Sequence, residues 1–348
     1  MFVNDSLPID FDKYLKLTNV SHWIYRIWAI GFITIGILGN IFALIIFIHW
    51  ANRLSIYIYF TFLCIINILI IIFDIKYHYL IPFLINNEIM IKNLLPITCK
   101  FMFFLTYFFR YLFIWLIVMI NIDRCLYLTE SSLKSILCRQ HSAKIICIIL
   151  IIFCFIANCH FLIFFTKPII NEILPKNQCF LDSFDYHCES SNRNYHYFLK
   201  RIWPIYNLIL FGVLPILIMI ICCILILRNI RSTRNGILDN EERRGSKSSA
   251  SSQNDHLHSV AKTLICLDLL FPITIFPTLF FQIYINYNPP ETCLYIGIVN
   301  LIFSIGFSIT FIKNTFGFFI YYITGKKFRH AFSALIRCKN IDAYNENH

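Results

Sequence analysis

Long apolar stretches separated by short polar segments run through the chain, and seven of them are long enough to cross a lipid bilayer. A bilayer core of about 30 Å needs about 20 apolar residues in a helix. Lipid offers no partner for backbone N–H and C=O groups, so each crossing segment must be helical. The pattern predicts an all-α membrane protein, a seven-transmembrane helix bundle. Its expected spans are residues 26–48, 57–80, 96–128, 143–165, 203–229, 258–285 and 293–322.

The loops indicate how this bundle, residues 26–322, is oriented. Lys and Arg gather after the fifth and seventh spans, whereas residues 286–292 between the sixth and seventh spans carry none. Positively charged loops stay in the cytoplasm, so we expect residues 1–25 to be extracellular and residues 323–348 to form a cytoplasmic tail. Two N-x-S sequons fall on the outer side, which predicts glycosylation of Asn4 and Asn19. We therefore expect a multi-pass plasma-membrane protein.

Composition excludes several classes of function. The chain is 58% hydrophobic and 14% charged, too apolar for a water-soluble domain. The net charge of +11 comes from short basic runs between spans and not from one patch, so we expect no nucleic-acid partner. There is no CxxC pair and no His/Cys cluster with zinc spacing, and His160 has no evident acidic companion in its span. We expect no metal, no cofactor and no enzymatic activity.

Two polar segments are expected on the cytoplasmic side. Residues 231–257 are rich in Ser, Asn and Arg, which predicts a disordered third cytoplasmic loop. Its serines suggest phosphorylation, with kinases and arrestin as further partners, although a plain linker has the same composition. In the tail, Phe328, Phe332, Leu335 and Ile336 recur at helical spacing with cations between them, which predicts a short amphipathic surface helix. Cys338 follows as a candidate palmitoylation site.

The third span carries functional residues at both ends. Cys99 lies at its outer end, and the pair Asp123-Arg124 lies at its inner end. Twenty-five residues of helix extend about 37 Å, enough to cross the bilayer. A cation at the membrane edge needs a partner, so Asp123 and Arg124 form a candidate switch on the side facing the cytoplasm.

With these residues in place, the chain resembles a rhodopsin-like (class A) G-protein-coupled receptor, over nearly its whole length. The resemblance implies a heterotrimeric G protein as the partner and a sixth helix that swings outward to expose Arg124. It rests on the order and spacing of several motifs, namely Gly39-Asn40, Asp123-Arg124-Cys125, Pro215, Phe271 with Pro277, and Tyr321 followed by Phe328-Arg329. We take Asp123, Arg124, Phe271, Pro277 and Tyr321 as the expected switch residues.

Several positions depart from the family pattern. The sixth-helix Trp is replaced by Ile275, and only Tyr321 remains of the seventh-helix N-P-x-x-Y motif. The second-helix Asp of the family's sodium site appears as Asn67. The resemblance also implies a disulfide from Cys99 to a cysteine before the fifth helix. We favour Cys188 over Cys179, and Cys179 then pairs with Cys293.

The ligand is expected between the outer halves of the helices. Four candidate residues lie there: Asp74, Thr106, Arg110 and Lys313. One interpretation is that Asp74 pairs with Arg110 or Lys313 and only holds the bundle together. The other is that Arg110 meets a ligand carbonyl, carboxylate or C-terminal amide. By resemblance, Thr106 replaces the acidic residue of amine receptors, and Phe311 occupies the opsin lysine position, so that Lys313 faces elsewhere.

A peptide is the ligand class that remains. The long loop at residues 166–202 has mixed charge and two cysteines, and the chain resembles invertebrate neuropeptide receptors of the FMRFamide-like kind. Two alternatives stay open: a divergent receptor for a non-peptide small molecule, or a membrane transporter or channel. The last would require internal repeats or paired helix breaks, which the sequence lacks.

Overall fold

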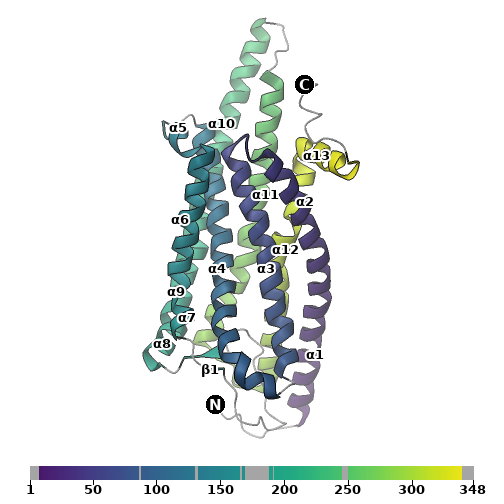
Figure 1. Cartoon of the computed structure of the whole chain (residues 1–348), viewed down its shortest axis with the longest axis vertical. Helices are drawn as coiled ribbons and strands as arrows, with labels where there is room; N and C mark the ends of the chain where they lie inside the picture. Colours follow the sequence, from purple (N-terminus) through teal and green to yellow (C-terminus); the bar gives the residue numbers. More distant parts are fainter. Residues whose placement is uncertain are drawn as a thin grey trace.

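The computed structural model describes the backbone of residues 8–85, 88–129, 132–164, 167–168, 188–190, 192–244 and 250–338. Side chains are described in these ranges except at 8–9, 25, 29, 74–99, 167–168, 188–189, 233–262, 264 and 286. Within this part of the chain, seven helices are long and apolar enough to cross a membrane, which confirms the predicted bundle (Figure 1). They are Asp10–Trp50, Ser55–Phe73, Lys100–Leu128, Gln140–Phe164, Arg193–Ser232, Ile265–Ile285 and Cys293–Thr324.

The first span is one long helix composed of α1 (Pro8–Gly31), a π-helical turn η1 (Phe32–Gly36) and α2 (Ile37–Trp50). It begins well before residue 26, where the apolar pattern placed the start of the first span. The added turns pack against the last span, where a Cβ on Gly297 would lie 3.2 Å from Leu17 Cδ1 and from the Cα of Tyr14. This close contact gives the amphipathic start of the chain a surface on which to fold as a helix.

The second, third and fourth spans follow in order. They comprise α3 (Ser55–Ile85), α4 (Glu88–Leu128) and α6 (Gln140–Asn158), which continues into α7 (His160–Phe164); a short helix α5 (Lys134–Leu137) precedes α6. The span in α4 has the largest buried share of the seven. Its residues Phe113, Leu116 and Ile117 are almost completely enclosed. α4 is therefore the central helix, which neighbouring helices contact on several sides.

A small hairpin and an irregular fifth span come next. The strands β1 (Lys167–Pro168) and β2 (Cys188–Glu189) pair antiparallel. The fifth span runs through α8 (Arg193–Tyr197), η3 (Phe198–Ile202), α9 (Trp203–Asn207), η4 (Leu208–Val213) and α10 (Leu214–Arg244). The π-helical turn η4 ends just before Pro215. A proline lacks the N–H of a regular turn and crowds the preceding carbonyl, which explains an irregular turn at this place.

The sixth and seventh spans are α11 (Ala250–Tyr287) and α12 (Cys293–Thr324). α10 and α11 both extend beyond the rest of the bundle at one end (Figure 1). The expectation of a disordered loop at residues 231–257 is therefore wrong for 231–244 and 250–257, which are helical. No proline occurs between Pro215 and Pro272. A helix satisfies its own backbone hydrogen bonds, so polar composition alone does not prevent it from continuing into water.

After α12 the chain turns at Gly325 and forms α13 (Lys326–Ile336), which lies across the end of the bundle (Figure 1). Phe328 and Ala331 are buried, and the Phe332 ring packs against Phe42 and Phe318. This confirms the predicted amphipathic surface helix.

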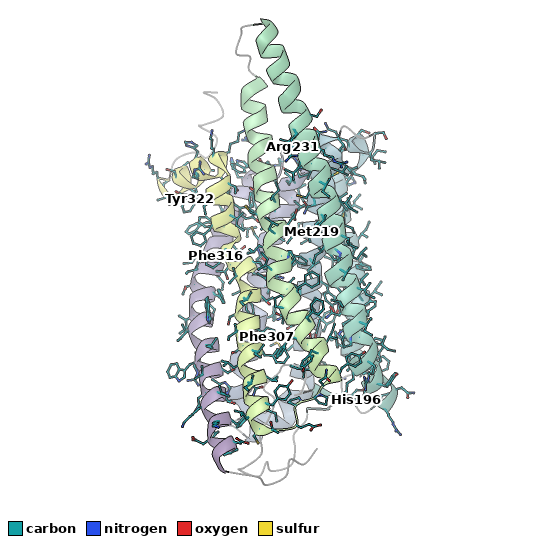
Figure 2. The ribbon with its side chains drawn as sticks, turned by 180° about the vertical axis from the view of Figure 1, so that it is seen from behind. His196, Met219, Arg231, Phe307, Phe316 and Tyr322 are labelled. Atoms are coloured by element: carbon teal, nitrogen blue, oxygen red, sulfur yellow. The ribbon has the colours of Figure 1, made fainter. Side chains whose placement is uncertain are left out.

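The two ends of the bundle can be located in Figure 2. Arg231 lies toward the same end as α13 and His196 lies at the opposite end (Figure 2). Many large apolar side chains between the two ends point outward, as lipid requires.

The contact between α2 and α12 depends on a glycine. A Cβ added to Gly39 would lie 3.0 Å from the Cβ of Phe318, an atom close to the backbone that cannot move aside without the helix. We expect Gly39→Leu to destabilise the protein by about 1–3 kcal/mol through overpacking. Gly31→Leu is the matched control, because no described atom lies within 4 Å of its added Cβ. Thermal unfolding of the purified protein measures both; equal melting temperatures would contradict the close packing.

Candidate functional site

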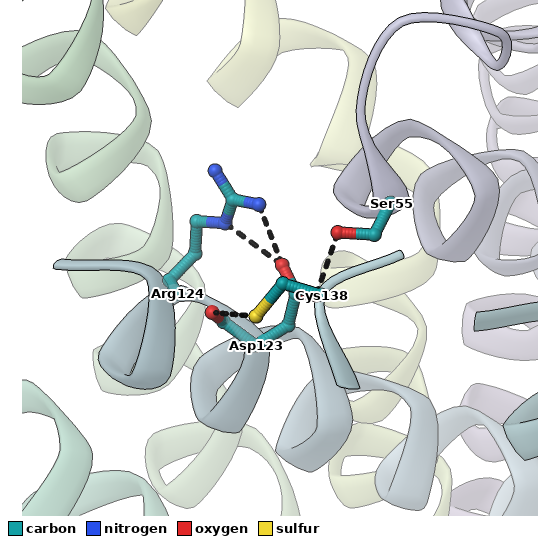
Figure 3. A network of polar contacts seen from close by, with 4 residues as sticks. All are labelled: Ser55, Asp123, Arg124 and Cys138. Carbon is teal, nitrogen blue, oxygen red and sulfur yellow. Dashed lines mark hydrogen bonds and ion pairs between the residues drawn. The ribbon is translucent and has the colours of Figure 1, made fainter. Parts of the chain in front are cut away.

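At the end of the bundle that carries α13, α4 holds a buried ion pair between neighbouring residues. Arg124 Nε lies 3.1 Å and Arg124 Nη2 lies 2.5 Å from Asp123 Oδ2 (Figure 3). The other carboxylate oxygen, Asp123 Oδ1, accepts a hydrogen bond of 2.7 Å from the hydroxyl of Ser55, the first residue of α3. Both charged residues are less than 5% exposed. The pair is neutral as a whole, and this neutrality allows it to be enclosed.

The segment after α4 packs closely on this ion pair. The thiol of Cys138 donates to the backbone carbonyl of Asp123 at 3.4 Å (Figure 3). Burial, together with the nearby negative charge of Asp123, raises the pKa of the Cys138 thiol to about 11. The ring of Tyr127 lies between two cations, with Arg124 Cζ at 4.8 Å and Lys134 Nζ at 4.2 Å from its centroid. The loop therefore covers Asp123 on one side of α4.

A second polar network joins three helices in the middle of the bundle. Asn67 Nδ2 donates to Asn40 Oδ1 and Asn314 Nδ2 donates to Asn67 Oδ1, both at 3.1 Å. Asn40 Nδ2 donates to the backbone carbonyls of Gly36 and Asn314. All three asparagines are almost completely buried. Asn67, expected as the substitute for a sodium-binding acid, thus serves as both donor and acceptor between α2, α3 and α12.

The remaining expected switch residues lie on α11 and α12. Phe271 is 1% exposed, and its ring lies 5.3 Å from the ammonium of Lys313. Pro277 lies inside α11, one helical turn after Thr274, whose backbone carbonyl accepts a hydrogen bond from Thr310 of α12. Tyr321 is buried and packs edge-on against Phe47 and Phe60 and beside Phe328. These residues connect α11 and α12 to the neighbouring helices.

Toward the opposite end, the helices enclose a pocket of about 780 Å³, counting the space at its mouth. Aromatic and aliphatic side chains form most of its wall, with hydroxyl, amide and cationic groups between them. On one side the Tyr111 hydroxyl donates to Asn207 Oδ1 at 2.8 Å. Concave, mostly apolar pockets with a few polar groups bind small molecules or the end of a peptide. The polar residues on its wall are Tyr107, Arg110, Tyr111, Asn207, Thr278, Gln282, Thr310 and Lys313.

Two of the expected ligand-binding residues, Arg110 on α4 and Lys313 on α12, line this pocket. The Arg110 guanidinium lies 5.3 Å from the Phe307 ring, and the Lys313 ammonium lies 4.8 Å from the Phe113 ring. Lys313, expected both as a ligand-binding residue and to face elsewhere than the opsin lysine position, lies on the pocket wall, whereas Phe311 is not among the wall residues. Phe311 packs instead against Phe32 of η1. Residues 311 and 313 do face different sides of α12, as helix geometry requires. Alignment of the family motifs had placed Phe311, and not Lys313, on the side that faces the ligand.

The other expected residues divide into three groups. Thr106 is buried but does not belong to the described pocket wall. Asn19 and Cys338 are exposed, and the sequon residue Ser21 donates its hydroxyl to the Asn300 carbonyl. Glycosylation of Asn19 and palmitoylation of Cys338 stay predictions. Asn4 and Cys179, and the side chains of Asp74, Cys99 and Cys188, lie outside the described residues.

The pairing of Cys99 with Cys188 stays a prediction. Cys293 is disulfide-bonded, as expected for a cysteine in an outer loop, but its partner does not lie among the described side chains.

Sequence reasoning missed a polar contact between α4 and α11. Asn121 Nδ2 donates to Asp268 Oδ1 at 2.8 Å, one helical turn from Arg124. The sequence did contain a signal for this contact. Asp268 is an ionisable residue inside an apolar span, and such a residue marks a candidate functional site.

No curated protein matches the chain. A family model described as 7 transmembrane receptor (rhodopsin family) matches residues 39–321, well over half of the sequence. The match agrees with the seven helices, the buried Asp123–Arg124 pair at one end and the pocket at the other. The chain belongs to the rhodopsin family of seven-transmembrane receptors.

Proposed function

We propose that this chain is a neuropeptide receptor whose ligand enters the pocket around Arg110 and whose Arg124 end engages the G protein. Members of its family are membrane receptors that signal through heterotrimeric G proteins and are not enzymes. One observation carries the proposal: a single central helix, α4, bears the pocket residue Arg110 and the switch residue Arg124. Fourteen residues of helix separate them by about 21 Å. A change at one end can therefore bias the other.

The family membership gives no support to the transporter or channel alternative. Within the receptor class, the chemistry of the pocket wall favours a ligand with a carbonyl, carboxylate or C-terminal amide. Arg110 and Lys313 supply positive charge, Asn207 and Gln282 supply amides, and no acidic residue occurs among the described wall residues. A peptide terminus offers such acceptors beside apolar side chains. A non-peptide small molecule is the second candidate, because an apolar wall with a few polar groups also suits such a ligand.

The peptide proposal predicts a specific effect of Arg110→Gln. A neuropeptide library is first screened on the wild-type receptor in calcium and cAMP assays. The variant should lose about tenfold or more in potency toward the active peptide, since hydrogen bonds to a charged group contribute about 1.5–3 kcal/mol. Arg26→Gln is the matched control, because Arg26 is exposed on α1 and lies outside the pocket wall. Unchanged potency would remove Arg110 from the ligand site, and activation only by non-peptides would favour the second candidate.

At the other end, the Asp123–Arg124 pair represents the resting arrangement of the switch. In this state Asp123 neutralises Arg124, and Ser55 and Cys138 hold the carboxylate and its backbone in place. When α11 moves outward, Arg124 leaves Asp123 and meets the G protein. The prolines of α11 permit this movement because each removes one backbone hydrogen bond of the helix. Kinases and arrestin are proposed as further partners at the serines of residues 246–252.

Substitutions of the two charges should act in opposite directions. Arg124→Ala removes the group that the G protein needs, and we expect coupling to be lost while protein still reaches the cell surface. Asp123→Asn frees Arg124 from its counter-charge, and basal coupling should rise. A G-protein reporter panel normalised to surface expression measures both. A general folding defect lowers both signals, so a gain in Asp123→Asn separates the switch from stability. Normal signalling by Arg124→Ala would exclude Arg124 from the mechanism.

The proposed orientation places α13 and Cys338 in the cytoplasm and the N-terminal end of the chain outside. A membrane-impermeant maleimide, applied after hydroxylamine has cleaved any thioester, should label Cys338 only in permeabilised cells. Cys138 lies at the same end but should react slowly near pH 7.5, because its pKa of about 11 keeps the thiol protonated, and its rate should climb as the pH rises. Peptide mapping by mass spectrometry distinguishes the two. Labelling of Cys338 on intact cells would invert the proposed orientation.

A further inference from the structure

The hydrogen bond between Asn121 and Asp268 connects the central helix to the helix that the proposed mechanism moves. Asn121 is completely buried on α4, and its amide also donates to the Ile117 carbonyl of its own helix. Asp268 lies within the sixth candidate span, so we place its carboxyl group at membrane depth. An ionisable group at that depth is costly unless it has a partner. Asn121 is the described partner of its side chain.

The groups around the carboxyl are uncharged where they are described. The thiols of Cys222 and Cys223 on α10 lie near it. Among the described residues Asp268 makes no ion pair, and both Asp268 Oδ2 and Asn121 Oδ1 carry no hydrogen bond. The contact is therefore a hydrogen bond in an apolar setting, where such a bond is strong and is lost completely once the helices separate.

α11 is weakened at Asp268 itself. Pro272, four residues further on, has no N–H to donate to the Asp268 carbonyl, and Pro277 removes the corresponding bond to Ile273. The side chain of Asp268 thus holds α11 next to a place where the backbone of this helix is least constrained. A change of angle at this point costs less than it would in a regular helix.

α11 is also loosely packed. Its span has the smallest buried share of the seven described spans, and its main neighbours are α12 and then α10. Hydroxyl groups link it to α12, with Thr278 bonded to Thr310 and Thr263 bonded to Thr324. These bonds lie along one side of α11. The bond to Asn121 lies toward α4, across the space that opens when α11 moves outward.

We propose that Asn121 and Asp268 form a latch that holds α11 against α4 in the resting receptor and must open before Arg124 can engage a G protein. This inference rests on the proposed outward movement of α11. Asp268 acts as a positioning residue for the switch, and it does so as a hydrogen-bond acceptor, not as a charge. It follows that an amide at residue 268 keeps the latch, whereas an aliphatic side chain of similar size opens it.

The first test measures the movement without any ligand or G protein. Spin labels are attached at Thr129, beyond the end of α4, and at Lys262 on α11, through non-cysteine chemistry because the chain contains fourteen cysteines. The inter-label distance is recorded by double electron–electron resonance on the full-length receptor in nanodiscs. Asp268→Leu should populate a longer distance, and Asp268→Asn should keep the short one. An unchanged distribution in Asp268→Leu would overturn the latch even if the receptor proposal holds.

The second test reads signalling in cells. Asp268→Leu and Asn121→Leu should each raise basal coupling per surface receptor by about fivefold, the change that follows from losing one hydrogen bond. The exchanged pair Asn121→Asp with Asp268→Asn keeps one donor and one acceptor and should return to the wild-type level. Asn158→Leu is the matched control, because this buried amide donates only within α6. Basal coupling unchanged in both single variants, or not restored by the exchanged pair, would contradict the latch.

Discussion

Hydrocarbon offers no hydrogen-bond partner, and this constraint determines where the polar side chains of the spans lie. Several described polar side chains lie in the interior and bond to one another across helices. Asn40, Asn67 and Asn314 do so in the middle of the bundle, and Asp123, Arg124 and Ser55 do so at the α13 end. Each network connects two or more helices of the bundle. The groups that must avoid lipid are therefore also the groups that couple the helices.

Helix α4 and helix α11 play contrasting parts in this arrangement. α4 is the most buried span and bears both Arg110 and Arg124, so it is the fixed reference of the bundle. α11 is the least buried, contains Pro272 and Pro277, and depends on a few polar contacts to hold its position. In the proposed mechanism, a bundle with one tightly packed helix and one weakly held helix adopts two arrangements. A ligand that favours one of them shifts the population without altering the rest of the fold.

Lys313 shows how the pocket and the switch region meet. Its side chain lines the pocket, yet its ammonium lies over the rings of Phe113 on α4 and Phe271 on α11. Phe271 is one helical turn from Asp268 and from Ile275, which replaces the usual tryptophan of the sixth helix. With that tryptophan absent, a cation and two aromatic rings occupy the junction between ligand site and moving helix.

The sequence by itself determined the number of spans, their approximate positions, the surface helix α13 and the candidate switch pair. These features depend on local properties, since hydrophobic length defines a span and residue spacing defines a face of a helix. It did not determine which buried polar groups meet. The side that Lys313 faces and the contact of Asn121 with Asp268 were decided by tertiary packing. Such contacts join residues far apart in the chain, and their geometry is created only when the helices assemble.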